Sequence, residues 1–132
     1  MFSHITIGTT DLKSAERFYN LLLSPLGFKQ RRVSADGGPS SCCWVVGNDT
    51  LPRFYVYEPF NGEIAGVANG SMIAFLASSR DAVHLAYDAG IQAGGTCEGE
   101  PGERKHYGTG YYGAYLRDLD GHKVHIVYRG DI

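Results

Sequence analysis

Two kinds of hydrophobic periodicity succeed each other along the chain, and the succession occurs twice. Residues 2–8 and 71–77 are short apolar or alternating runs, which is typical of strands. Each run is followed by a segment in which apolar residues recur at helical spacing, at residues 12–23 and 80–93. Each half of the chain is therefore predicted to begin with a strand and a helix.

Short polar residues mark the expected starts of both helices. Asp11 and Ser79 precede the two helical segments, and side chains of this type cap helix N-termini. Further strands are expected after each helix, at residues 28–34, 41–46 and 53–58 in the first half, and near 96–98, at 111–117 and at 122–128 in the second. The order β-α-β-β-β, occurring twice, predicts an α+β fold.

A shift of 68 residues superimposes the two halves without a gap. It places Tyr19 over Tyr87 and Gly27 over Gly95, and the hydrophobic pattern agrees with this register. We expect a single domain over residues 1–132, with one module over about 1–62 and a second over about 69–132. Each half is too small to be stable alone. The prediction is two tandem βαβββ modules forming a curved mixed sheet around one cleft, with the helices on the outer face.

Composition narrows the classes of function. Twelve basic and 14 acidic residues give a net charge of −2, and no block of one sign occurs, so we expect no nucleic-acid partner. No apolar run approaches the ~18 residues of a membrane span, and the first residues do not resemble a signal peptide. A cytoplasmic protein without membrane association is expected. The three cysteines lack CxxC spacing and are interpreted as reduced thiols.

Strand alternation places several polar side chains on the faces opposite the helices. In the first strand His4 is expected to point away from the helix, as is His125 in the last strand. The 68-residue register makes Tyr57 the counterpart of His125, and Met72 the counterpart of His4. These four positions are predicted to converge on one cleft if the two sheets curl around it.

Several segments together resemble a known superfamily. They are HITIGTTDL at 4–12, AERFY at 15–19, DLDGHKVH at 118–125, PGERKHY at 101–107 and YYGAY at 111–115. The first three are similar to the opening and closing motifs of the vicinal oxygen chelate superfamily, which includes glyoxalase I, extradiol dioxygenases and bleomycin-resistance proteins. The last two resemble a glyoxalase-like bacterial subgroup. The resemblance covers essentially the whole chain.

That resemblance implies a divalent metal, such as Fe, Zn, Ni or Mn, held at the four convergent positions and acting as a Lewis acid. His4 matches the first ligand, and His125 stands where the superfamily usually has Glu. Met72 replaces a usual His, and its thioether is a poor ligand for these ions in an oxygen-rich site. Tyr57 offers only a neutral phenol. A loop carboxylate joining the two histidines would make a set suited to Fe(II).

Other candidate ligand-binding residues are aromatic or cationic. Arg104 and Tyr107 lie in the long loop of the second half, where a guanidinium could clamp a carboxylate or phosphate; the alternative is a solvated loop. Tyr55, Trp44 and Tyr112 could line an apolar pocket, and Trp44 and Tyr112 are counterparts in the 68-residue register. We also count Met72 among the ligand-binding candidates.

Two hypotheses follow from these residues and the resemblance. The first is a metal-dependent lyase, isomerase or oxygenase in which His4 and His125 hold the metal and Tyr57 and His125 are catalytic. The second is a small-molecule binding protein without a cofactor, as in the drug-sequestering branch of the superfamily. Met72 and the absence of a last-strand Glu favour the second hypothesis. The resemblance also implies a homodimer.

Overall fold

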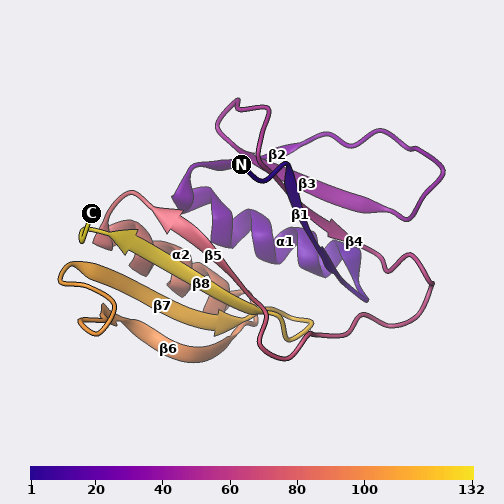
Figure 1. The fold of residues 1–132 in the computed structure, drawn as a ribbon. Coiled ribbons are helices and arrows are strands. Elements are labelled where there is room, and N and C mark those ends of the chain that lie inside the picture. Colours follow the sequence, from indigo (N-terminus) through magenta and orange to yellow (C-terminus); the bar gives the residue numbers. More distant parts are fainter.

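The computed structural model describes residues 1–132, and its elements follow the predicted order (Figure 1). The secondary structure consists of β1 (His4–Gly8), α1 (Leu12–Leu23), the 3-10 turn η1 (Ser24–Leu26), β2 (Phe28–Arg31), β3 (Ser41–Val46), β4 (Arg53–Tyr57), β5 (Met72–Ala77), α2 (Arg80–Gln92), β6 (Thr96–Glu103), β7 (Tyr111–Arg117) and β8 (Lys123–Arg129).

The strands form two four-stranded mixed sheets. The first sheet has the order β1-β4-β3-β2 and the second β5-β8-β7-β6. In each, the pair formed by the first and last strand of the module is parallel and the other pairs are antiparallel. The α+β class and the two tandem modules are thus confirmed. The two sheets are not closed into one, because β1 and β5 each end a separate sheet.

Both helices begin where the sequence predicted. Asp11 Oδ1 accepts a hydrogen bond from the Ser14 backbone N–H at 3.2 Å, and Ser79 Oγ accepts one from the Ala82 N–H at 3.0 Å. These caps satisfy N–H groups that have no partner within the helix. The buried stripe of α1 comprises Ala15, Phe18, Tyr19, Leu22 and Leu23.

Strand β6 is longer than the sequence indicated. A short strand near residues 96–98 was expected, whereas β6 runs from Thr96 to Glu103. Its pairing with β7 shifts register twice, between Cys97 and Gly99 and between Gly99 and Gly102. Glycine and proline are depleted in strands, but an edge strand tolerates them at bulges. This edge position explains why the composition concealed the strand.

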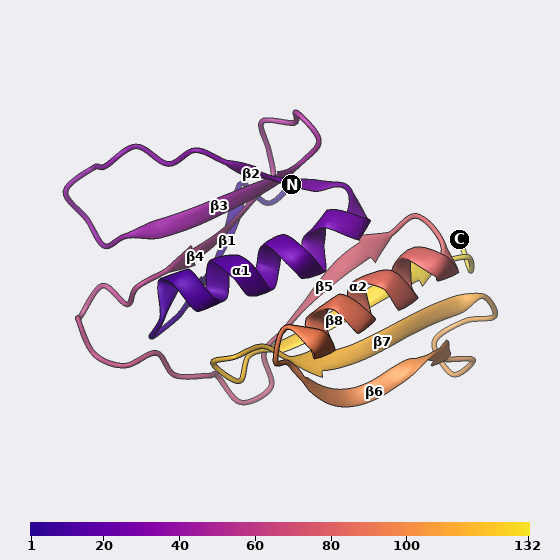
Figure 2. The ribbon, with the colours of Figure 1, turned by 180° about the vertical axis from the view of Figure 1, so that it is seen from behind.

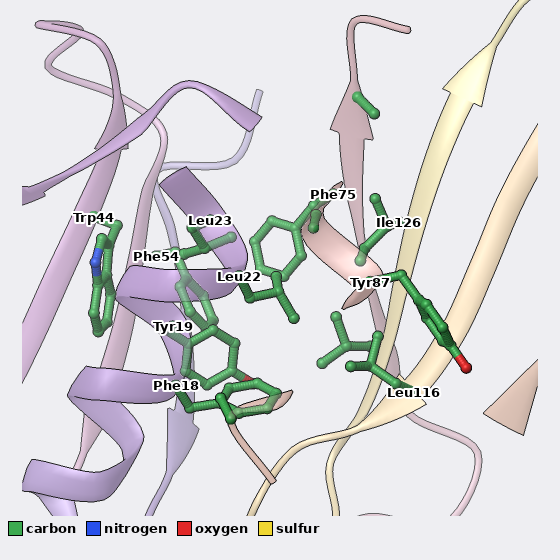
Figure 3. Packing of buried hydrophobic residues seen from close by; sticks show 14 of the residues in the cluster. Phe18, Tyr19, Leu22, Leu23, Trp44, Phe54, Phe75, Tyr87, Leu116 and Ile126 are labelled. Atoms are coloured by element: carbon green, nitrogen blue, oxygen red, sulfur yellow. The ribbon is translucent and has the colours of Figure 1, made fainter. Parts of the chain in front are cut away.

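The helix-facing sides of the two sheets share one hydrophobic core (Figure 3). The ring of Phe75, from β5, lies 5.2 Å from that of Phe54 in β4 and 5.6 Å from that of Phe28 in β2. Helices α1 and α2 pack against each other beside their sheets (Figure 2). Each helix covers its own sheet, and the two modules bury further apolar surface against each other in this shared core, as expected for halves that cannot fold alone.

Polar contacts also join the modules at the turn between β7 and β8. Buried Asp118 accepts a hydrogen bond from the Tyr19 hydroxyl of α1 at 2.6 Å. The His122 ring donates from Nε2 to the Gly8 carbonyl at 2.7 Å. The DLDG motif thus has a structural role at the junction of the modules. Neither helix is both long enough and apolar enough to cross a membrane.

Candidate functional site

A cavity of about 850 Å³ lies on the face of the first sheet that is turned away from α1. We call this face the open face of the first sheet; it carries His4, Arg53, Tyr55 and Tyr57, all of which line the cavity. The parallel register pairs Thr6 with Tyr55, so alternate side chains of β1 and β4 point to the same side. The segment 58–66 forms the opposite wall.

Aromatic rings form one wall of this cavity. The His4 and Tyr55 rings meet edge to face at 5.7 Å, and the Tyr55 and Tyr57 rings lie 5.5 Å apart. Arg53 donates a hydrogen bond from Nη1 to the Tyr55 hydroxyl at 3.2 Å, which helps to orient that ring. Such rings offer apolar surface together with polar groups at their tips, a combination that suits a small organic ligand.

His4 retains a ring nitrogen that can bind a ligand. Its Nδ1 lies 3.0 Å from the Ser3 hydroxyl, and its Nε2 has no hydrogen-bond partner in the protein. The side chain is exposed, so ligand access requires no rearrangement. A neutral imidazole nitrogen can donate or accept a hydrogen bond, depending on the tautomer.

From sequence, residue 58 was expected to end the strand 53–58, and the loop 59–70 was interpreted only as the boundary between modules. In the structure the segment 58–66 lines the cavity, and its Phe60 and Ile64 side chains are 92% and 83% exposed. Two large apolar residues within a loop rich in Gly and Asn were the available signal. Arg53 was also missed, because a single arginine at a strand start has no distinguishing pattern in the sequence.

His125 lies on the second sheet, where both of its ring nitrogens are already occupied. Its Nδ1 is 2.8 Å from the Ala114 carbonyl oxygen, which can only accept, so Nδ1 carries the proton. Nε2 therefore accepts from the Tyr111 hydroxyl, at 2.8 Å. Burial lowers the pKa of His125 and raises that of Tyr111, which keeps the imidazole neutral and the phenol protonated.

The His125 ring is also held by packing. Its plane is nearly parallel to that of Tyr115, with centroids 4.0 Å apart, and the side chain is fully buried. Gly113 makes room for it, since a Cβ at that position would stand 2.5 Å from His125 Cε1. We call this side, which carries Tyr111, Tyr115, Lys123 and His125, the open face of the second sheet. His125 is therefore buried, with both of its ring nitrogens hydrogen-bonded within the sheet.

Arg104 and Tyr107 lie at the border of the open face of the second sheet. The Arg104 guanidinium is 5.7 Å from the Tyr115 ring centroid and donates to the Glu100 carbonyl at 2.7 Å. Tyr107 is 58% exposed, with its ring 5.1 Å from that of Tyr111. Neither residue lines the large cavity.

Trp44 and Tyr112 lie on the helix-facing sides of their sheets, in contrast to the expectation that they line a ligand pocket. Trp44 is 1% exposed and donates from Nε1 to Asn20 Oδ1 at 2.8 Å. The Tyr112 hydroxyl is 2.6 Å from Nε2 of His84 on α2. The strand pairing does not make them counterparts, because Leu116 pairs with Val124 in the place where Trp44 pairs with Phe54. Both rings pack against a helix.

The four positions predicted to converge are divided between separate places. His4 and Tyr57 line the large cavity. Met72 is 45% exposed and borders a different, much smaller hollow beside the start of β8. His125 is not part of the cavity lining. Strand parity thus assigned the faces of His4 and Tyr57 correctly, whereas the two sheets do not curl around one site within the chain.

The residues present do not fit the divalent metal that the superfamily resemblance implies. No three His, Cys, Asp or Glu side chains come together in a way that could hold an ion. His125 has no free lone pair, because Nδ1 is protonated and Nε2 accepts from Tyr111. Met72 supplies only a thioether, which hard and borderline ions bind poorly. His4 alone would be a weak ligand.

Comparisons with known proteins agree with this fold. A model of the Glyoxalase/Bleomycin resistance protein/Dioxygenase superfamily matches residues 1–126. A crystal structure of a glyoxalase/bleomycin resistance protein from Albidiferax ferrireducens T118 is 36% identical, with a TM-score of 0.81 and 98% of each chain covered. Hypothetical protein SA1046 from S. aureus is 23% identical, with a TM-score of 0.69 over 97% of this chain and 95% of that one. A glyoxalase-related enzyme from Fulvimarina pelagi is 18% identical, with a TM-score of 0.70 over 97% and 87%. No curated protein matches the chain.

Proposed function

Because the chain belongs to the Glyoxalase/Bleomycin resistance protein/Dioxygenase superfamily, we propose that it binds a small organic molecule in the cavity of the first sheet, without a metal ion. Tyr55 and Tyr57 would pack against the body of the ligand. His4 Nε2 would form a hydrogen bond with one of its polar groups. The cavity volume, about 850 Å³, lies in the range typical of small-molecule sites.

The observation that carries this proposal is the state of His125. In the metal-dependent hypothesis this residue is a ligand, yet Tyr111 and Ala114 already use both ring nitrogens. A metal would have to displace the Tyr111 hydroxyl and enter a fully buried position. This argument holds for one chain or two, since all three residues come from β7 and β8 of the same sheet.

A lyase, isomerase or oxygenase activity would need another catalytic arrangement. Tyr57 lines the cavity and has a hydroxyl group, so its role as a proton donor remains a prediction. The proposed catalytic role of His125 is disfavoured by its burial. The anion clamp at Arg104, expected in the same site as His4 and His125, stays a prediction; Arg104 does not line the large cavity.

We also propose a homodimer. Strands β1 and β5 are both sheet edges, and exposed edges with apolar side chains favour pairing with another chain. Ile5, Met72 and Leu76 on these strands are 38%, 45% and 64% exposed. Light scattering coupled to size-exclusion chromatography tests this point; a mass near 14.4 kDa at micromolar concentration would exclude a stable dimer. The cytoplasmic location remains a prediction from the sequence.

The test of the ligand site is a fragment screen by ligand-observed NMR, followed by titration of hits into variants. His4→Ala and Tyr57→Ala are expected to weaken hits of the cavity by about tenfold each, as for loss of a hydrogen bond or of aromatic contact. His84→Ala is the control, because His84 is exposed on α2 and does not line the cavity. The proposal fails if hits bind as tightly to both cavity variants as to the control. Metal content is measured in parallel, and one equivalent lost in His4→Ala would contradict metal-free binding.

A further inference from the structure

A second hollow, of about 290 Å³, adjoins the large cavity on the open face of the first sheet. Three arginines line it: Arg31 at the end of β2, the next residue Arg32, and Arg53 at the start of β4. Arg53, Tyr55 and Tyr57 line both hollows, so the two spaces meet at these side chains. The arginines therefore border the proposed ligand site.

Strand pairing fixes the position of this basic hollow. Arg31 pairs with Cys43 in β3, and Cys43 pairs with Tyr55 in β4, which places the three side chains in one row on the same face. Burial raises the pKa of the Cys43 thiol, while the charges of Arg53 and Arg31 act in the opposite direction. Arg31, Arg53 and Cys43 all line the same hollow.

The positive charge of the hollow is not neutralised within the chain. The ion pairs of the protein involve other basic residues, and none includes these three arginines. Asp36 is the one carboxylate in the lining, and its Oδ1 accepts from the Gly38 N–H at 2.9 Å. Arg53 donates from Nε to the Thr50 carbonyl and from Nη1 to Tyr55, which leaves its Nη2 free. Three cations therefore face one carboxylate in a chain whose net charge is −2.

We infer that the ligand of the first sheet is an organic anion, with its carboxylate or phosphate held by Arg31, Arg32 and Arg53 and its aromatic or apolar body in the large cavity. This inference rests on the proposed function. Guanidinium groups bind both kinds of oxyanion through paired hydrogen bonds. Glu58, directly after the end of β4, lines the large cavity but not the arginine hollow, so its carboxylate disfavours an anionic group in that part of the large cavity. The ligand is thereby oriented across the sheet, from β2 toward β1.

Three probes of the same shape test the inference: 2-naphthoate, 2-naphthyl phosphate and neutral 2-naphthamide. Binding is measured by titration with NMR detection at low salt. We expect at least one anion to bind about tenfold more tightly than the amide, the size typical of charge-assisted hydrogen bonds at a partly exposed site. The carboxylate and phosphate arms decide which headgroup is preferred. Arg31→Gln, outside the lining of the large cavity, should remove most of this preference and leave amide binding unchanged. Arg53→Gln should also remove the preference.

Arg17→Gln is the matched control, because it removes the same charge from an exposed position on α1. Equal affinities of anions and amide, all weakened by His4→Ala, would overturn the inference while the proposed ligand site stands. An equal loss of anion binding in Arg17→Gln and Arg31→Gln would reduce the effect to net charge and also overturn it. If none of the three probes binds, the inference is overturned. The fragment screen then tests the proposed function separately. Loss of the anion preference in Arg104→Gln alone would place the anion site on the second sheet.

Discussion

The two modules share one topology but differ in what their open faces can still bind. On the first sheet, Tyr57 lines a cavity beside His4, whose Nε2 is free. On the second sheet, His125 takes the place of Tyr55 rather than that of Tyr57, because it pairs with Ala74 in β5 as Tyr55 pairs with Thr6 in β1. Both of its ring nitrogens are bonded, and its ring is stacked on Tyr115. The two modules thus share their strand order but not the availability of polar groups. A residue type at the expected position does not make a ligand when its neighbours already satisfy it.

Adding a methyl group to the second face should have the largest effect. Gly113→Ala would place a Cβ 2.5 Å from His125 Cε1 and 3.0 Å from the Ile126 carbonyl oxygen, neither of which has free space to move. We expect a loss of about 2–3 kcal/mol in the free energy of unfolding, as for overpacking of a core. Gly8→Ala on the first face is the comparison, since its nearest neighbours would be at 3.5 Å. Urea unfolding measures both, and equal losses would show that the two faces do not differ in packing.

Removing one hydroxyl group from each face is a finer test. Tyr111→Phe leaves His125 Nε2 buried without a donor and should cost about 1–3 kcal/mol of stability. Tyr55→Phe removes an acceptor of Arg53 at a half-buried site that water can reach, and should cost less than about 1 kcal/mol. A larger loss of stability in Tyr55→Phe than in Tyr111→Phe would contradict the hydrogen bond from the Tyr111 hydroxyl to His125 Nε2.

The pH dependence of stability should carry a smaller signature of the second face. Burial, with smaller contributions from Arg104 and Lys123, lowers the pKa of His125 in the folded protein below the ordinary value of about 6.5. At pH values between the lowered pKa of the folded protein and about 6.5, the unfolded chain binds a proton at His125 that the folded chain does not. The contribution of His125 to the free energy of unfolding is therefore fully present above about pH 6.5, and it is lost as the pH decreases toward the lowered pKa.

Thermal unfolding of the wild type and His125→Gln across pH 5–8 measures this effect. The variant should lose the part of the slope that His125 contributes. Leu85→Gln, which introduces the same amide at an exposed and non-titratable position of α2, is the control and should retain the wild-type slope. An unchanged slope in His125→Gln would mean that folding does not lower the pKa of this imidazole.

Much of the fold could be predicted from the sequence because local signals agreed with one another. Asp11 and Ser79 marked the helix starts, and the apolar stripes indicated which side of each helix is buried. Strand β6 was underestimated because its glycines and proline lower the strand signal, although an edge position tolerates them. Strand alternation correctly placed Tyr55 and Tyr57 together with His4.

The site itself was only partly predictable. Alternation gives the face of a residue within its own sheet, but it does not give the position of one sheet relative to the other. His4 and His125 were therefore expected to meet, although they lie on separate sheets. Nor does the pattern show that Tyr111, across the β7–β8 pair, would occupy Nε2 of His125. The arginine hollow combines Arg31 and Arg53 from strands that are distant in sequence, and only the register brings them together.

The contrast between the two histidines can be measured directly by two-bond ¹H–¹⁵N NMR spectra of their ring nitrogens, recorded during titration with Zn²⁺ and with a cavity ligand. We predict that His125 remains a neutral Nδ1–H tautomer throughout, with unchanged Nε2 shifts, while the ring nitrogens of His4 respond to the ligand. A shift of His125 Nε2 together with His4 on addition of one equivalent of Zn²⁺ would contradict this account and restore the metal site.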